Sequence, residues 1–281
     1  FTDADVSGGL IAMIQVRDPL QFGGAPIDES SHGTGFDRVG AFQDGFIGGP
    51  ERCKSFFTEN RESLLINIPF NADDPNGNLP LVDANPDPTD GPADVVTLLP
   101  ADLDRYWTAQ LATNNLTLTP PTVTLFTSDG DVPSCDGVDS SQLVRNVYYC
   151  AASNTIFIDQ DWAEKSIRDP LLGDMSIGYL ISQGYSENVQ ALLGSTLTDE
   201  PRALLDDCLT GAWIRDDLPP QVEGRPLYLS AGDLDEAIVT AIVRGDATSD
   251  TNVNGSAFEK VDAFRSGVLG GMESCQARIT P

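Results

Sequence analysis

Few residues of this chain are suited to hydrolytic or metal chemistry, because it carries a single histidine, His32. A zinc site combines several His or Cys ligands, and a Ser-His-Asp triad needs an imidazole beside an activated serine. His32 lies in the segment Ser-Ser-His-Gly-Thr-Gly, which resembles no nucleophile elbow. The neighbouring Gly33 and Gly35 lack the Lys and Ser/Thr that complete a phosphate-binding loop. We therefore expect His32 to be an ordinary surface or core residue.

The segment from Asp174 to Gly194 has the clearest helical pattern in the chain. Asp174 is expected to cap this helix and Gly194 to end it. Its apolar positions recur at helical spacing: Ile177, Leu180, Ile181, Tyr185, Val189, Leu192 and Leu193. Residues four apart share one helical face, which is how the two histidines of an H-E-x-x-H motif grip one zinc ion. The corresponding positions hold Gln183, Gly184 and Glu187, so this helix carries the spacing without the ligands.

The elements around this helix predict an α+β fold, with a small sheet packed on several helices. Two segments alternate as strands, Thr122–Phe126 and Asn154–Asp159. The further helices are expected at 100–111, about 200–214, 232–244 and 256–270.

Short motifs follow one another in order through the C-terminal part of the chain. They include Tyr149-Cys150, Asn154–Asp159, Gly178-Tyr179, Asp207-Cys208, Gly211-Ala-Trp213 and Leu229-Ser-Ala-Gly-Asp-Leu-Asp-Glu-Ala237. Over about residues 98–278 this order resembles the bacterial neutral zinc metallopeptidase family, a zincin-like group of envelope and secreted proteins. The resemblance implies a zincin-like domain, preceded by an irregular acidic N-terminal segment.

In that family the zinc helix reads like G-Y-x-x-A-H-E-x-G-H-H-V-Q. The resemblance puts the first zinc ligand at Gln183, the catalytic Glu at Gly184 and the second ligand at Glu187. The third ligand, a Glu, corresponds to Ala203. All three ligands and the general base are replaced together, so no catalytic residue, zinc ion or other cofactor is expected.

The resemblance also implies a cleft that holds an extended peptide along an edge strand. Asn154, Ile156 and Ile158 are the candidate peptide-pairing residues of that strand. The favoured function is a catalytically inactive, metallopeptidase-like binding or scaffolding subunit in the bacterial cell envelope. Its expected partner is another protein.

The alternative function is a hydrolase or peptidase whose site uses carboxylates and an ion other than zinc. Asp174, Glu187, Asp206 and Asp207 offer oxygen donors of the kind that Ca²⁺ or Mn²⁺ accepts. We favour structural roles for them. Asp174 then caps a helix, Asp207 joins a helix pair by hydrogen bonds, and Glu187 faces water.

The net charge limits the kinds of partner the protein can bind, and the cysteine content indicates its cellular compartment. The net charge of -27 argues against nucleic acid as a partner, and no stretch reaches the roughly 20 apolar residues of a membrane span. Five cysteines fit two disulfides in an oxidising compartment and one odd thiol. The expected pairs are Cys135 with Cys150, which bracket a short loop, and Cys208 with Cys275. Cys53 is left over, either buried and inert or bonded to a partner.

The chain divides into three predicted segments. Residues 1–70 form the N-terminal segment, 71–96 a Pro/Gly/Asn-rich acidic connector, and 97–281 the metallopeptidase-like domain. Because the chain opens at Phe1 without an initiator Met, we expect a processed product that lost a signal peptide or a lipoprotein anchor. The expected location is secreted, periplasmic or in the cell envelope, with the lipid anchor left open.

Overall fold

The computed structural model describes residues 2–25, 30–57, 65–73, 77–89, 91–220, 222–245 and 253–279. Within this part of the chain, helices and one three-stranded sheet form an α+β fold, as the sequence predicts. No helix among these residues combines the length and apolarity needed to cross a membrane. Residues 74–76 and 90 of the predicted connector lie outside the described part.

The chain forms two compact units, each assembled from separate segments. Unit 1 contains Phe1–Gly77, Thr198–Gln221 and Leu229–Cys275, and unit 2 contains Asn78–Leu197, Val222–Tyr228 and Gln276–Pro281. Residues 198–275 thus contribute mainly to the same unit as the N-terminal segment. The predicted division at residues 70 and 96 concerns chain segments, and it stays a prediction.

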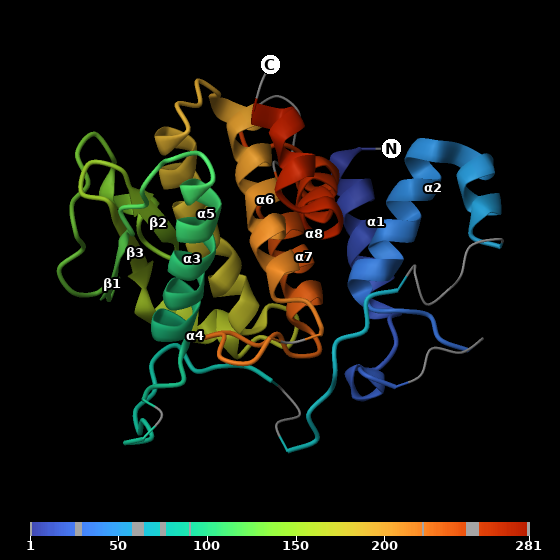
Figure 1. The fold of residues 1–281 in the computed structure, drawn as a ribbon, viewed down its shortest axis with the longest axis horizontal. Helices are drawn as coiled ribbons and strands as arrows, with labels where there is room; N and C mark the ends of the chain where they lie inside the picture. The colour runs from blue at the N-terminus through green and yellow to red at the C-terminus, as the bar shows by residue number, and fades with distance from the viewer. Residues whose placement is uncertain are drawn as a thin grey trace. The chain divides into compact units, whose positions relative to one another are not determined.

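Unit 2 contains the sheet and its covering helices (Figure 1). Its elements are α3 (Val95–Ala112), β1 (Thr122–Phe126), the 3-10 helix η3 (Ser140–Gln142), β2 (Val147–Cys150), β3 (Thr155–Asp159), α4 (Gln160–Ile167) and α5 (Gly173–Leu192). The strand order is β1-β3-β2, with β1 parallel and β2 antiparallel to β3. Helix α5 contacts α3, α4 and β2.

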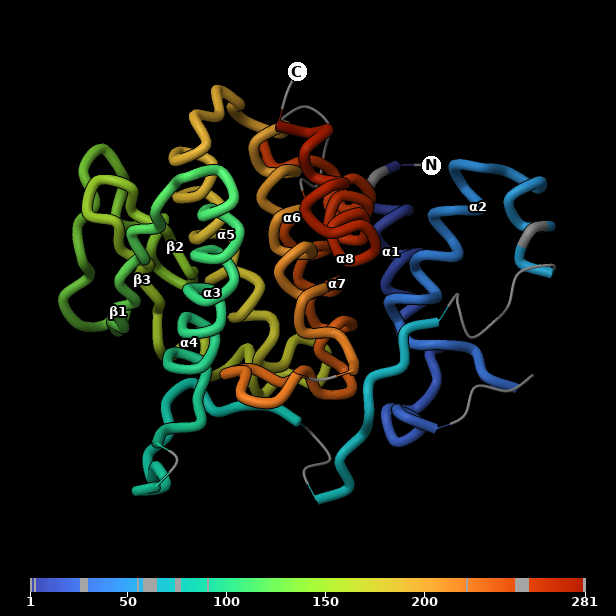
Figure 2. Tube along the Cα trace, viewed as in Figure 1, coloured from blue at the N-terminus to red at the C-terminus, as the bar shows by residue number. Residues whose placement is uncertain are grey.

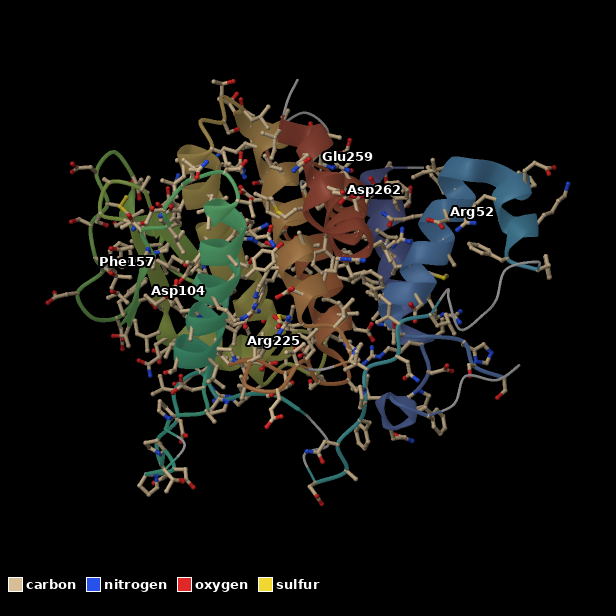
Figure 3. The ribbon with its side chains drawn as sticks, viewed as in Figure 1. Arg52, Asp104, Phe157, Arg225, Glu259 and Asp262 are labelled. Atoms are coloured by element: carbon tan, nitrogen blue, oxygen red, sulfur yellow. A yellow bond between two sulfur atoms is a disulfide. The ribbon has the colours of Figure 1, made fainter. Side chains whose placement is uncertain are left out.

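The two faces of the sheet have different coverings. Side chains alternate along a strand, so Ile156 and Phe157 of β3 point to opposite faces. Ile156 packs toward α5 at Gly184. Phe157, labelled in Figure 3, packs on the other face against Phe126 and Leu143. The loop between β1 and β2 therefore closes the second face, and the Cys135–Cys150 disulfide anchors it to β2.

The prediction that β3 is an edge strand is wrong. The short strand β2, which the sequence pattern did not reveal, pairs Val147–Cys150 with Thr155–Ile158. Strand β1 pairs on the other side of β3 over its full length. The outer strands of the sheet are therefore β1 and β2.

Helix α5 matches its predicted extent, but its predicted N-cap is wrong. The helix begins at Gly173, and the N-cap residue Leu172 makes no side-chain hydrogen bond. Asp174 lies inside the first turn, where its Oδ2 accepts a hydrogen bond from Leu79 N at 2.9 Å. Gly194 follows the helix with a φ of 72°, the left-handed conformation that favours glycine at a helix end.

Unit 1 is helical in its described part. Its elements are α1 (Asp3–Gln15), the 3-10 helix η1 (Leu20–Phe22), α2 (Gly35–Ser55), α6 (Asp199–Asp216), α7 (Asp233–Val243) and most of α8 (Ala257–Ile279). Helices α1 and α2 lie side by side, and both contact α7 (Figure 2). Capping boxes start both helices, Thr2 with Asp5 on α1 and Thr34 with Asp37 on α2.

Helices α6 and α8 approach until their backbones touch. A Cβ atom on Gly211 would collide with Phe264 O, and one on Gly267 would collide with Cys208 O. Small residues at both positions allow this contact, and the Cys208–Cys275 disulfide ties the same two helices. Both predicted disulfides are confirmed, and Cys53 is a free, exposed cysteine.

Candidate functional site

The predicted site positions on α5 lie on two faces of the helix. Gln183 and Glu187 are both half-buried, because residues four apart lie on the same face of a helix. Gly184 is buried and faces the sheet, where an added Cβ would lie 2.9 Å from Ile156 Cγ1 and Cδ1 and 3.2 Å from Tyr149 Cβ. These contacts are closer than a real methyl group makes, so α5 packs on the sheet through a position that has no room for a glutamate.

The hydroxyl of Tyr185 on α5 forms a structural hydrogen bond within unit 2. Tyr185 Oη donates to Asp104 Oδ1 at 2.8 Å, and Asp104 is labelled on α3 in Figure 3. Burial, and then the bond to Asp104, raises the pKa of Tyr185, so it stays a hydrogen-bond donor at neutral pH. Burial also raises the pKa of Asp104, against the opposing effect of this bond. The pair joins α3 to α5 and has the properties of a core contact.

The three predicted peptide-pairing residues are engaged inside the unit. Asn154 adopts a left-handed φ of 48°, and its Oδ1 accepts hydrogen bonds from Tyr149 Oη at 2.9 Å and Asn188 Nδ2 at 2.6 Å. Ile156 and Ile158 are fully buried and their strand is paired on both sides. The prediction that these residues pair with a peptide is therefore wrong, because their backbone positions are occupied by β1 and β2.

Asp207 and Asp174, two of the carboxylates considered as ligands for another ion, bind groups within their own unit. In unit 1, Asp207 is buried on α6 and pairs with Lys260 Nζ of α8 at 2.8 Å, which confirms its role in joining a helix pair. Its neighbour Asp206 is also buried, and Ala203 of the same helix is half-buried.

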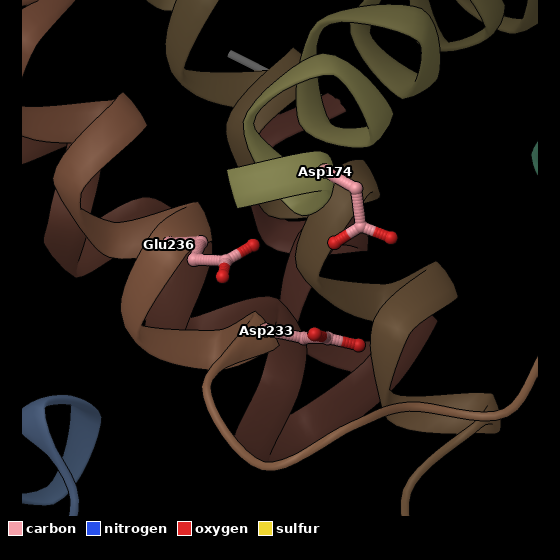
Figure 4. Close-up of side chains that lie close together, drawn as sticks. All are labelled: Asp174, Asp233 and Glu236. Carbon is pink, nitrogen blue, oxygen red and sulfur yellow. The ribbon is translucent and has the colours of Figure 1, made fainter. Parts of the chain in front are cut away.

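Three further acidic side chains stand in the first turns of two helices (Figure 4). Asp233 and Glu236 belong to α7 of unit 1, and Asp174 belongs to α5 of unit 2. Asp233 Oδ2 accepts a hydrogen bond from Ser230 N at 2.8 Å. Asp174 and Asp233 thus bind backbone N–H groups near helix N-termini, a favourable place for negative charge.

Unit 1 contains a cavity of about 240 Å³ that sequence analysis did not predict. We call it the unit 1 cavity, and its walls come from residues 18–25, 30–37, 65–68 and 231–235. Leu20, Phe22, Ile66, Ile68 and Leu234 provide apolar surface. Phe22 is 57% exposed, so the cavity opens to solvent at that residue. Three carboxylates, those of Asp18, Asp37 and Asp235, are also among its lining groups.

Asp37 is one of two carboxyls in the unit 1 cavity whose pKa is raised. Its Oδ2 accepts hydrogen bonds from Thr34 N at 2.9 Å and Thr34 Oγ1 at 2.8 Å, and its Oδ1 accepts one from Ile66 N at 3.0 Å. Burial nevertheless raises the pKa of Asp37 to about 6, and the negative charge of Asp235 adds to this increase. A carboxyl with such a pKa changes charge close to neutral pH.

Asp235 lies deeper in the wall, with 3% of its surface exposed. Its Oδ1 accepts a hydrogen bond from Phe36 N at 2.8 Å, and its Oδ2 lies 3.0 Å from Arg17 Nε. Burial raises the pKa of Asp235, although Arg17 opposes this effect.

The third carboxylate, Asp18, organises the loop that carries the single histidine. Asp18 Oδ2 accepts hydrogen bonds from His32 N at 2.6 Å and Gly33 N at 2.9 Å, and Oδ1 lies 3.2 Å from His32 Nδ1. Burial raises the pKa of Asp18, but these hydrogen bonds outweigh it and hold the pKa below its usual value. The side chain of His32 is 67% exposed. The expectation of an ordinary surface residue is consistent with this environment.

The sequence does not reveal Asp37 and Asp235 as cavity residues, because each stands in the pattern of an ordinary helix start. Thr34-x-x-Asp37 is a capping box, and Asp235 stands in the acidic first turn of α7. Nothing in either pattern indicates that the two lie in the wall of one cavity.

No family model, curated protein or solved structure matches this chain. The resemblance to the neutral zinc metallopeptidases therefore stays an expectation that rests on the residues themselves.

Proposed function

We propose that this chain is a zincin-like protein without peptidase activity, which binds another polypeptide in an oxidising, extracytoplasmic compartment. Its location there is supported by two disulfides, since such bonds form and persist in oxidising compartments. The zinc-helix framework then serves as a core element that supports a binding surface.

The packing of Gly184 carries the proposal. A zinc peptidase of this type needs a glutamate at this position to take a proton from the zinc-bound water. Here an added Cβ would lie 2.9 Å from Ile156 and 3.2 Å from Tyr149, so any side chain at this position would have to displace its neighbours. The flanking Gln183 and Glu187 replace the histidines, and an amide with a carboxylate is a poor substitute for two imidazoles at zinc.

The surface proposed for binding is the outer side of β1. Strand addition needs an outer strand of a sheet, and among the described residues β1 pairs with β3 and with no other strand. The strand leads into a loop whose exposed acidic residues are Asp129, Asp131, Asp136 and Asp139. The sequence has no Lys or Arg from Tyr106 to Val144. An extended segment with basic side chains complements this charge.

A cleavage assay tests the loss of catalysis. The purified protein is incubated with labelled casein and a mixture of unlabelled peptides, with and without a metal chelator, beside an active H-E-x-x-H peptidase as positive control. We expect no cleavage above buffer in either condition. Chelator-sensitive cleavage by the purified protein would overturn the proposal.

A binding assay tests the surface. The probe is an extended peptide of alternating Lys and Val, and the readout is the dissociation constant at low ionic strength. The double variant Asp129→Asn/Asp131→Asn should weaken binding several-fold. Asp161→Asn, which removes an exposed charge from α4 of the same unit, should leave binding unchanged. Equal effects of the two variants would contradict a role for the β1 loop.

A further inference from the structure

We propose that the unit 1 cavity is a binding site for a small organic cation, namely a primary ammonium group on a short apolar body. This site is separate from the proposed polypeptide surface, because all of its lining residues belong to unit 1. Small-molecule sites in proteins typically combine apolar walls with a few convergent polar groups, and the unit 1 cavity has this composition.

The charge inside the cavity is predominantly negative. Of the three lining carboxylates, Asp235 lies beside Arg17, and Asp18 lies beside His32. Within the part of the chain that the structure describes, Asp37 accepts hydrogen bonds from Thr34 and Ile66, all of them from uncharged donors. Among the described residues, no basic side chain forms an ion pair with Asp37. A ligand cation would supply the opposite charge that Asp37 lacks.

A second polar group in the wall also lacks a full set of hydrogen bonds. Asp235 Oδ2 is buried and accepts no hydrogen bond from any described residue, although Arg17 Nε lies near it. Buried carboxylate oxygens are ordinarily hydrogen-bonded. An ammonium group has three N–H donors, so it can serve Asp37 and a neighbouring acceptor together.

The arrangement of the carboxylates favours an organic cation over a bare metal ion. A metal ion needs several ligand atoms that converge on one point. Asp18, Asp37 and Asp235 do not form a group with oxygens within 4.8 Å of one another among the residues described. They are distributed along the wall, between apolar side chains such as Ile68 and Leu234.

The volume limits the size of the ligand. Drug-sized sites have volumes of roughly 300–1,000 Å³, and the unit 1 cavity has about 240 Å³. A ligand with a single ring or a short alkyl chain fits this volume. A small free amine has the required chemistry.

Three single-ring probes test the proposal on the full chain. Benzylammonium carries the cation, benzyl alcohol is its neutral counterpart, and benzoate carries the opposite charge. Binding is measured by titration with detection of protein amide NMR shifts at pH 7.5. We expect benzylammonium to bind at least tenfold more tightly than benzyl alcohol, and benzoate not to bind.

Two variants locate the binding site. Asp37→Asn should weaken benzylammonium binding at least tenfold. Glu273→Gln removes an exposed charge from α8 of the same unit, away from the lining residues, and should leave the affinity unchanged. If Asp37→Asn fails to fold, Ala231→Leu, which fills the cavity from another wall, should abolish binding of the same probe.

The pH dependence provides a test on the unmodified protein. The negative charge of Asp235 acts on Asp37, and Asp18 also lines the cavity. Arg17 forms an ion pair with Asp235, and His32 lies beside Asp18. Because burial raises the pKa of Asp37 to about 6, its carboxylate is present above that pH and is neutralised below it. The affinity for benzylammonium should therefore decrease between pH 7 and pH 5.

Three results would overturn the proposal. One is equal affinity for benzylammonium and benzyl alcohol, which would make the cavity an apolar site. The second is the same loss of affinity in Asp37→Asn and Glu273→Gln, which would indicate nonspecific attraction. The third is no shift with any probe at 10 mM. The cleavage assay and the comparison of Asp129→Asn/Asp131→Asn with Asp161→Asn change no residue of the unit 1 cavity, so the two proposals fail independently.

Discussion

Filling Gly184 should destabilise the protein, although glycine is normally unfavourable inside a helix. Replacing a helical Gly by Ala stabilises a protein by about 1 kcal/mol when the new methyl group meets no obstacle. At Gly184 the methyl would lie 2.9 Å from Ile156 and 3.2 Å from Tyr149. Overpacking of this kind costs about 1–3 kcal/mol. We expect Gly184→Ala to lower the free energy of unfolding by about 1 kcal/mol, the difference between these terms.

A glycine with open space around it provides the matched control. Gly8 lies inside α1, and no atom is within 4 Å of an added Cβ. Gly8→Ala should raise the free energy of unfolding by about 1 kcal/mol. The free energy of unfolding of both variants is measured by urea titration. The dependence of this free energy on urea concentration is also compared, because a change in its slope would indicate an altered unfolded or native state. The two substitutions are chemically identical, so their difference isolates the contact with the sheet.

A second substitution tests whether the contact with Ile156 causes the loss of stability in Gly184→Ala. Ile156→Val in the original protein should cost about 0.5–1.5 kcal/mol, as is usual for this change in a core. In the Gly184→Ala background it should cost about 1 kcal/mol less, because it removes the Cδ1 atom that the new methyl meets. If Gly184→Ala stabilises the protein as much as Gly8→Ala does, Gly184 is not tightly packed against the sheet.

Three other properties of unit 1 can be tested by the same unfolding experiment. Replacing Cys208 and Cys275 by Ser opens a loop with a sequence separation of 67 and should cost about 4 kcal/mol; a loss below 1 kcal/mol would contradict a constraining role. Lys260→Met should cost about 3–5 kcal/mol, because it leaves the buried Asp207 carboxylate without its partner. The double variant Lys260→Met/Asp207→Leu should cost less than the sum of the single changes, and additivity would argue against a coupled pair. Finally, the folded-state pKa of Asp37, about 6, lies above its ordinary value of 3.8, so the folded state binds this proton more tightly. Relative to Asp37→Asn, the original protein should therefore gain about 2 kcal/mol as the pH falls from 7 to 4; a difference that is constant with pH would refute this.

Sequence patterns predicted the elements whose signals are local. The apolar period from Ile177 to Leu193 identified α5, and alternation identified β1 and β3. The disulfide pairs followed from cysteine count and spacing. The edge-strand prediction was wrong because β2 is only four residues long and its segment, Val147–Cys150, does not alternate in hydrophobicity.

The unit 1 cavity was not predictable in the same way. Its walls come from four segments between residues 18 and 235, and Asp37 and Asp235 look like ordinary helix-start residues when each is considered alone. Asp37 acquires its raised pKa only because tertiary contacts bury it near Asp235. For Gly184, the sequence shows that the glutamate base is absent. The close packing against Ile156 could be seen only in the structure.

The zinc content of the purified protein is the direct test of whether helix α5 has lost its zinc site. The protein is prepared without chelator, dialysed against micromolar zinc and then against metal-free buffer, and analysed by mass spectrometry for metal per chain. We expect well below a tenth of a zinc ion per chain, because Gln183, Gly184 and Glu187 include neither a histidine nor a cysteine. One zinc ion per chain that Glu187→Ala removes would contradict it.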